Sequence, residues 1–77
     1  MTSDTIEEAV IGSMLISPDA IVAVFEAGIT ASHFYRLRHQ HIFRAVESLA
    51  DRGVAVDLVT VTDRLVESDL LADAGGH

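Results

Sequence analysis

The stretch that decides the fold runs from Leu37 to Asp57 and reads LRHQHIFRAVESLADRGVAVD. Up to Arg52, its apolar side chains recur at the three- and four-residue spacing of an α-helix. Gly53 follows, and glycine readily adopts the left-handed conformation that ends many helices. Asp57 then offers a carboxylate that can cap the start of another helix. The pattern predicts a helix over residues 37–52, a short extended link and a second helix that begins at Leu58.

At about 100° per residue, the two predicted helices each have one apolar side. In the first helix this side comprises His39, Ile42, Phe43, Val46, Leu49 and Ala50. The opposite side, predicted to be solvated, comprises Gln40, Arg44, Glu47, Ser48 and Asp51. In the second helix, expected to end near Glu67, the inward residues are Leu58, Val61, Thr62 and Leu65. Ser68 or Asp69 is predicted to cap a further helix starting at Leu70, because both residue types favour helix N-termini.

Helix start and stop signals also mark the first half of the chain. Ser3 or Asp4 is predicted to cap a helix that runs to about Ile16. Ser17-Pro18 begins a short second helix that Gly28 ends, and residues 29–35 form a single turn. The sequence therefore predicts one all-α domain over residues 1–77, a compact orthogonal bundle of about five to six helices. Ile21, Phe25 and Phe34 complete its predicted core.

The predicted first helix is apolar on two sides. One side carries Ile6, Ala9, Val10 and Ile16, and of these Ile6 and Val10 are assigned to the core. The other side carries Ile11, Met14 and Leu15, which are the candidate protein interface. Two readings remain open: the helix is sandwiched inside its own domain, or its second side meets a partner. Gly12, which costs about 1 kcal/mol relative to alanine in a helix, is expected where another helix approaches closely.

Composition excludes several classes of protein. The 77 residues contain no cysteine, which excludes disulfides and thiolate metal sites, and the formal net charge is -7. Such a charge repels phosphates, so no direct nucleic-acid binding is expected. No apolar run is long enough for a signal peptide or a membrane span. The expected location is the cytoplasm, and domains this small often gain stability by association.

No catalytic, cofactor-binding or metal-binding residue is predicted. His39 and His41 diverge by about 200° on a helix, whereas helical metal pairs use spacings of three or four. His39 is instead expected to be half-buried, with its ring nitrogen bonded locally. The chain lacks lysine and has no phosphate-binding loop. Glu7, Glu8, Asp63 and Glu67 are expected on solvated surfaces.

Two weaker signals point toward nucleic acid. Phe34 and Tyr35 precede Arg36 and Arg38, a mixture of aromatic and basic residues found at some nucleic-acid sites, but the structural role is favoured, with Phe34 in the core. Residues 57–65 followed by a helix from Leu70 also suggest a helix-turn-helix. This stand-alone DNA-binding module is the alternative function, although the second helix offers no side chain suited to a base edge.

Taken in order, the segments of this chain closely resemble the N-terminal domain of DnaB-type replicative helicases. The matching segments are IEEAVIGSML at 6–15, SPDAI at 17–21, HFY at 33–35, HQHIFRAV at 39–46, DRG at 51–53, VDLVTV at 56–61 and GG at 75–76. Each segment alone is an ordinary amphipathic helix or its cap. The specificity lies in their common order and spacing from Ile6 to Gly76.

The resemblance implies a helical bundle that, in the family, precedes a helical hairpin, a linker and a motor domain. None of these later parts is predicted within residues 1–77. It implies pairing of subunits in a hexameric collar, by self-association, and docking of primase or a helicase loader. ATP and Mg²⁺ would belong to the motor domain, where ATP-dependent 5'-to-3' unwinding takes place. The expected role of this segment, which is not itself an enzyme, is oligomerisation and partner docking in DNA replication.

Overall fold

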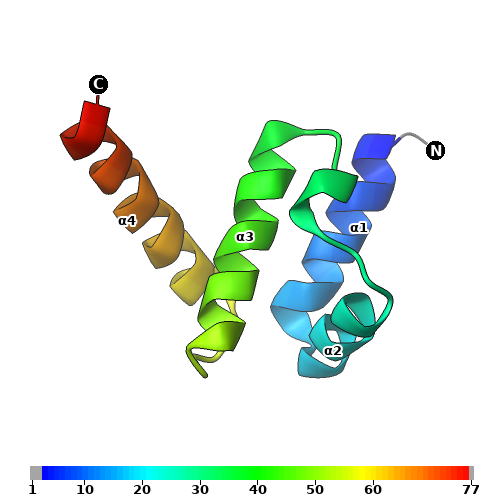
Figure 1. The fold of residues 1–77 in the computed structure, drawn as a ribbon. Coiled ribbons are helices and arrows are strands. Elements are labelled where there is room, and N and C mark those ends of the chain that lie inside the picture. Colours follow the sequence, from blue (N-terminus) through cyan, green and yellow to red (C-terminus); the bar gives the residue numbers. More distant parts are fainter. Residues whose placement is uncertain (1–2, 77) are drawn as a thin grey trace.

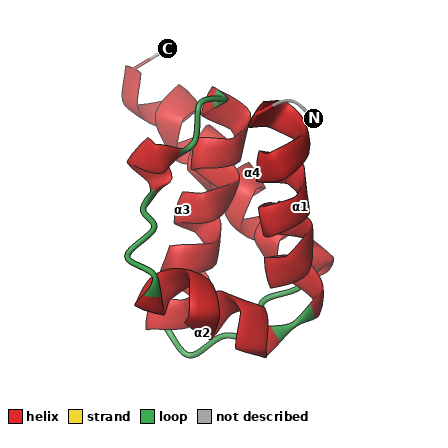
Figure 2. Ribbon diagram, turned by 90° about the vertical axis from the view of Figure 1, so that its right-hand side faces the viewer, coloured by secondary structure: helices red, strands yellow, loops and turns green. Residues whose placement is uncertain are grey.

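The computed structural model describes the backbone of residues 3–76 and the side chains of residues 4–68. In chain order the elements are α1 (Ser3–Ile16), α2 (Pro18–Glu26), the 3₁₀ turn η1 (Ala31–His33), α3 (Leu37–Asp51) and α4 (Leu58–Gly76). Over residues 3–76 there is no strand, and short loops join the helices (Figure 2). The predicted all-α class is therefore confirmed. No helix in this part of the chain has the length and apolar character needed to cross a membrane.

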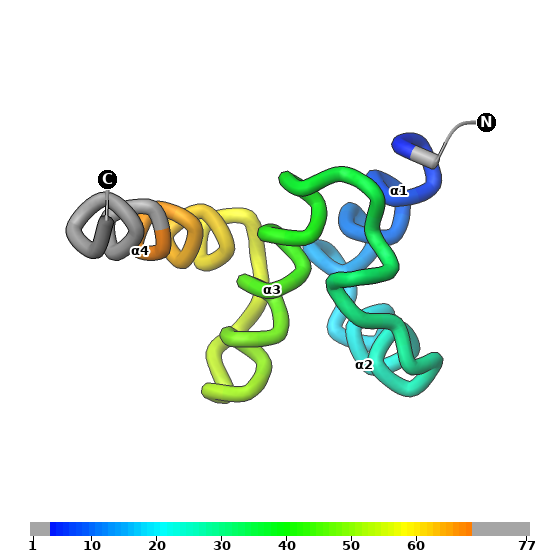
Figure 3. Tube along the Cα trace, turned by 45° about the horizontal axis from the view of Figure 1, so that its top comes forward, coloured from blue at the N-terminus to red at the C-terminus, as the bar shows by residue number. Residues whose placement is uncertain are grey.

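Helix α3 occupies the middle of the domain. It packs against α1 and η1 on one side and against α4 on the other, while α2 packs against α1. Figure 1 shows α4 leaving the end of α3 and running back beside it at an angle, with α1 and α2 on the far side. Figure 3, from another direction, again places α3 between α4 and the α1–α2 pair. A helix with neighbours on two sides has to bury side chains in both directions.

The number of helices differs from the prediction of five to six. Within residues 3–76 there are four α-helices and one 3₁₀ turn, because the expected break at Ser68 or Asp69 does not occur. Ser68 Oγ donates to the carbonyl oxygen of Arg64, at 3.0 Å, instead of capping a new helix. A serine hydroxyl satisfied one turn back leaves the helix uninterrupted. Within residues 3–76, no turn separates residues 57–65 from the segment that starts at Leu70, as the helix-turn-helix required.

The other helices begin and end where the capping residues and glycines of the sequence predict. Ser17 Oγ accepts from the backbone N–H of Ala20, at 3.3 Å. Asp57 and Thr60 cap each other: Asp57 Oδ1 accepts from Thr60 N at 2.9 Å, and Thr60 Oγ1 accepts from Asp57 N at 3.0 Å. Gly28 and Gly53, after α2 and α3, have φ angles of 78° and 70°. These local signals fixed most helix boundaries because each satisfies a backbone group at a helix end.

The core is centred on three aromatic rings. Phe43 of α3 is fully buried and meets Phe25 edge-on at 5.9 Å and Phe34 at 5.1 Å, measured between ring centroids. Aromatic pairs in such geometries contribute roughly 0.5–1.5 kcal/mol beyond their buried area. The buried apolar residues are Ile11, Met14, Ile21, Ala31, Phe34, Phe43, Ala45, Val46, Leu49 and Val61.

Most residues predicted for the core lie in it or against it. Ile21, Phe34, His39, Phe43, Val46, Leu49 and Val61 are buried, and Val10, Phe25, Ile42 and Leu65 are partly buried. The prediction is wrong for Ile6 and Leu58, whose exposed fractions are 52% and 69%. Leu58 shares the inward side of α4 with Val61 and Leu65, but it is the first residue of the helix and stays exposed.

Gly12 does not mark a close approach of helices. A Cβ atom built there would have no neighbouring atom within 4 Å, and its φ angle is not positive. The expectation of a tight helix contact at this position is therefore wrong. Gly12 is a helix-interior glycine with open space beside it.

We expect Gly12→Ala to stabilise the domain by about 0.4–1 kcal/mol, because alanine loses less backbone entropy and has room for its methyl group. Urea unfolding followed by circular dichroism measures the change. Gly28→Ala is the matched control: its positive φ strains any L side chain, so the same substitution should destabilise the domain there. Equal effects of the two substitutions would contradict this account.

Candidate functional site

The candidate interface on α1 is largely buried inside the domain. Ile11 and Met14 have exposed fractions of 6% and 0%, and Leu15 is partly buried against the core. The reading that this side is free to meet a partner is therefore wrong for Ile11 and Met14. Met14 belongs to the core together with Phe43 and Val46. The side of α1 that faces solvent is instead the one that carries Ile6 and Ile16.

Glu7 determines which side of α1 faces inward. Its carboxylate is 8% exposed, and Glu7, Ile11 and Met14 follow one another at helical spacing on the same side. The expectation that Glu7 is a solvated surface residue is wrong. With apolar residues on both sides of the helix, the requirements of this one acidic residue decide the orientation.

The Glu7 carboxylate binds the start of α3. Oε1 accepts from His39 Nδ1 at 2.6 Å and from the backbone N–H of Arg36 at 3.3 Å, while Oε2 accepts from the N–H of Tyr35 at 2.6 Å. An ionised carboxylate only accepts hydrogen bonds, so Nδ1 of His39 carries the proton. A negative charge at a helix N-terminus also interacts favourably with the helix dipole. Glu7 thus caps α3 from another helix.

These contacts keep Glu7 ionised. The hydrogen bond from His39 lowers the pKa of the Glu7 carboxyl most, and the backbone N–H of Tyr35 lowers it further. Desolvation acts in the opposite direction but does not prevail. His39, 3% exposed, is more deeply buried than predicted, and its partner lies in α1 instead of nearby in sequence.

A second ion pair lies beside the first. Arg36 Nε donates to Asp4 Oδ1 at 2.6 Å, and this bond lowers the pKa of Asp4 and raises that of Arg36. The Arg36 guanidinium also lies 5.8 Å from the centre of the Tyr35 ring. Arg38 and Glu8 approach to 3.9 Å at the exposed rim. The arginines that follow Phe34 and Tyr35 are therefore matched by acidic residues of α1, which weakens the case for nucleic-acid binding there.

Asp4, Glu7 and His39 bring potential metal ligands together, with ligand atoms within 4.8 Å of one another. Those atoms already have partners, however. Asp4 accepts a hydrogen bond from Arg36, and Glu7 accepts one from His39 and two from backbone N–H groups. A cation would have to displace these donors and lie next to a guanidinium. The cluster is better described as an ion-pair network that joins α1 to α3.

His33 and His41 lie apart from this network. His33 is exposed, and its Nδ1 accepts from the backbone N–H of Thr30 at 2.8 Å, which closes the turn η1. His41 is exposed, on another side of α3 from His39. The three described histidines therefore lie in different surroundings and form no common site.

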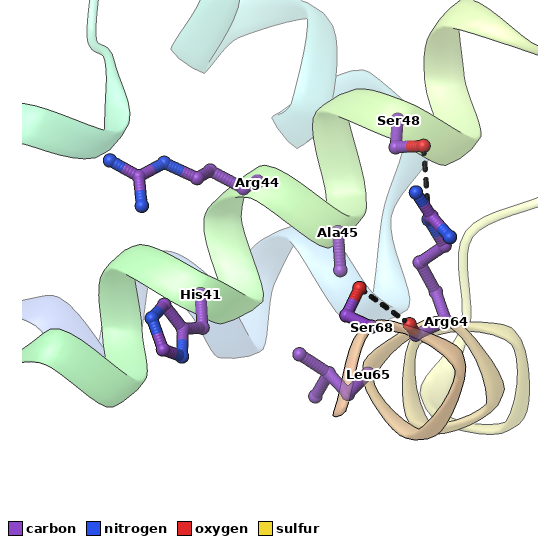
Figure 4. Close-up of a pocket in the computed structure, with 7 residues that line it drawn as sticks. All are labelled: His41, Arg44, Ala45, Ser48, Arg64, Leu65 and Ser68. Carbon is purple, nitrogen blue, oxygen red and sulfur yellow. Dashed lines mark hydrogen bonds between the residues drawn. The ribbon is translucent and has the colours of Figure 1, made fainter. Parts of the chain in front are cut away.

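The second feature is a groove between α3 and α4 with a volume of about 330 Å³. Figure 4 shows its lining residues: His41, Arg44, Ala45, Ser48, Arg64, Leu65 and Ser68. Arg64 Nε donates to Ser48 Oγ at 3.1 Å, which links the two helices. A smaller hollow of about 190 Å³ lies along the same helices and includes Asp63 and Glu67. The larger groove combines cationic and apolar groups, an arrangement suited to binding.

Comparison with known proteins gives a consistent result. The profile of the family described as DnaB-like helicase N terminal domain matches residues 2–77. The chain belongs to this family. It is 44% identical over 70 residues to the replicative DNA helicase DnaC of Bacillus subtilis and 46% identical over 70 residues to the replicative DNA helicase DnaB of Geobacillus stearothermophilus. In each case the alignment covers 91% of this chain and 15% of the relative.

The replicative DNA helicase DnaB of Rhodothermus marinus is similar as well, at 46% identity over 91% of this chain and 7% of its own length. The chain thus spans a small part of the length of the relatives that it matches. No solved structure matches the fold closely enough to be significant. The resemblance inferred from the order of sequence segments is confirmed.

Sequence reasoning missed Glu7 as a structural residue of this DnaB-like domain. A usable signal was present: His39 lies on the apolar side of its helix, and a buried imidazole requires a hydrogen-bond partner. Glu7 shares its helical stripe with Ile11 and Met14. Each of these two apolar stripes contains one polar residue, and pairing those two residues would have identified the contact between Glu7 and His39.

We expect Glu7→Gln to lower the melting temperature by roughly 5 °C or more, given that small domains shift several degrees per lost interaction of this kind. The neutral amide fills the same space, but it loses the charge that three donors share. Differential scanning calorimetry measures the shift. Glu8→Gln, at an exposed neighbouring position, is the control and should change little. A similar shift for both variants would show that Glu7 contributes no more than a surface acid.

The lowered pKa values also predict how stability depends on pH. Because the pKa of Glu7 is depressed in the folded state, its contribution is fully present above the ordinary value of 4.5 and is lost as the pH falls through the folded pKa. The difference in unfolding midpoint between wild type and Glu7→Gln should therefore be constant near neutral pH and shrink below about 4.5. Urea titrations at several pH values measure it. A difference that grows with acidity would contradict the sign.

Proposed function

We propose that this domain is the N-terminal assembly and partner-docking domain of a replicative DNA helicase. The observation that carries the proposal is the family match over residues 2–77, together with 44–46% identity to proteins named replicative DNA helicases. In this proposal the whole protein unwinds duplex DNA 5'-to-3' in the cytoplasm during replication. ATP and Mg²⁺ act in a motor domain outside residues 1–77.

The chemistry of the described residues supports a binding role over a catalytic one. The most perturbed ionisable groups, Asp4, Glu7 and Arg36, are held in contacts that join α1 to α3. Perturbed groups of this kind mark catalytic sites only when a substrate can reach them. Glu7 and His39 are buried, so the network serves the fold. Among the described residues, the surface features available to a ligand include the α3–α4 groove and scattered exposed apolar residues.

The proposed partners are other copies of the chain, in a dimer or as part of a hexameric collar, and a primase or helicase loader. Exposed apolar side chains that suit such contacts include Ile6, Ile16, Leu58, Val59 and Val66. The net charge of -7 disfavours direct binding to nucleic acid by this segment. Binding proteins, and not DNA, is therefore the role proposed for it.

Light scattering coupled to size exclusion tests the proposal on the purified 77-residue chain, alone and mixed with the primase or loader of its own organism. We expect concentration-dependent self-association, co-elution with at least one of these proteins, and no retention of a single-stranded oligonucleotide at low salt. Met14→Asp, which places a charge in the core, is the control and should abolish every interaction together with folding. A chain that stays monomeric and co-elutes with neither protein would overturn the proposed function.

A further inference from the structure

The groove between α3 and α4 carries an unusual concentration of positive charge for this molecule. Arg44 and Arg64 are two of the five basic residues, and His41 lies beside them, whereas the chain as a whole has 12 acidic residues. Among the described residues no carboxylate lines this groove. The smaller hollow along the same helices contains Asp63 and Glu67. The described lining of the larger groove is thus cationic, although the domain as a whole is acidic.

The two arginines are held differently. Arg64 is fixed by its hydrogen bond to Ser48 and by Glu67, whose Oε2 lies 3.4 Å from Nη1. Arg44 is exposed, and within residues 4–68 it has no ion-pair partner. Arg44 lines the groove, and Figure 4 shows its side chain extending from α3 on the side away from Arg64 and Leu65. A cation with no carboxylate opposite it is available to an acidic ligand.

The floor of the groove is apolar. Ala45 is 5% exposed, and Leu65 packs against the core while still lining the groove. Ala45 is a small lining residue of this groove, which lies between two helices that diverge from the end of α3 (Figure 1). A small inorganic anion would use the arginines but leave Leu65 and Ala45 uncovered. A ligand that contacts both the arginines and the apolar floor needs an apolar stripe next to acidic groups.

We propose that the α3–α4 groove is a docking site for an amphipathic helix of a partner protein, one that carries acidic residues beside an apolar stripe. Ala45 and Leu65 give the groove an apolar floor between the two helices, and helix-in-groove binding places apolar residues at spacings of three and four against such a floor. Acidic residues along its flank would meet Arg44 and Arg64. This inference rests on the proposed docking function and names the chemistry of the partner.

The test uses two labelled synthetic peptides of equal length with leucine at positions i, i+3, i+4 and i+7. One has glutamate at the flanking positions and the other has lysine. Fluorescence anisotropy is measured with wild type, with Arg44→Glu, and with Arg52→Glu as the matched control. Arg52 ends the same helix, lines the smaller hollow and undergoes the same change of charge. Circular dichroism verifies that each variant is folded, and Arg44→Ala is a milder second variant.

We expect the glutamate peptide to bind and the lysine peptide to bind at least about tenfold more weakly, because unlike charges attract across the groove and like charges repel. Arg44→Glu should weaken binding of the glutamate peptide about fivefold or more. Arg52→Glu should change it by less than about twofold, and added salt should weaken the wild-type complex. Equal binding of the two peptides, or equal effects of the two variants, would overturn the inference.

Other occupants give different results. If Arg44→Glu dissolves a dimer seen by light scattering, the groove binds a second copy of the chain, and the proposed partner is wrong. If an oligothymidine displaces the glutamate peptide, the groove is a nucleic-acid site, and the inference is overturned as well. Equal co-elution of wild type and Arg44→Glu with primase or loader would sink the groove assignment while the docking function stands. Failure of wild type to associate with any protein would sink the docking function itself.

Discussion

The arrangement of this domain depends on a single buried carboxylate. Glu7 satisfies two backbone N–H groups at the start of α3 and the imidazole of His39, so it links the beginning of the central helix to α1. Removing a charged partner from buried donors is costly because they then lack both water and a protein acceptor. The orientation of α1, the burial of Ile11 and Met14, and the exposure of Ile6 all follow from this contact.

Much of the fold was predictable because its local signals are independent of tertiary structure. Ser17, Asp57, Gly28 and Gly53 act on backbone groups within a few residues, and the structure confirms them. The inward side of α3 was also predictable, since its apolar residues form one arc. Ala45 was not, because a small residue next to that arc is buried only when α4 covers it.

The predictions from sequence that were wrong share a physical origin. Hydrophobic periodicity cannot choose between two apolar sides of one helix, and in α1 the choice fell to a polar contact with His39, 32 residues away in sequence. The candidate interface therefore became core, and Ile6 became surface. Likewise, the cap signal at Ser68 was overridden when its hydroxyl bonded to Arg64 within the helix. The family resemblance was more robust, because it relied on the order of many segments instead of the face of one.

The groove could not be inferred from sequence, because its residues come from two helices and its character depends on how they diverge. One consequence concerns local stability. Helix α3 is held by ion pairs, aromatic contacts and neighbours on two sides, whereas residues 58–68 of α4 contribute one buried side chain, Val61. Segments with few buried contacts open at lower free-energy cost than the rest of a domain. Amide hydrogens of residues 58–68 should accordingly exchange with solvent sooner than those of α3, so one wall of the groove is less firmly anchored than the other.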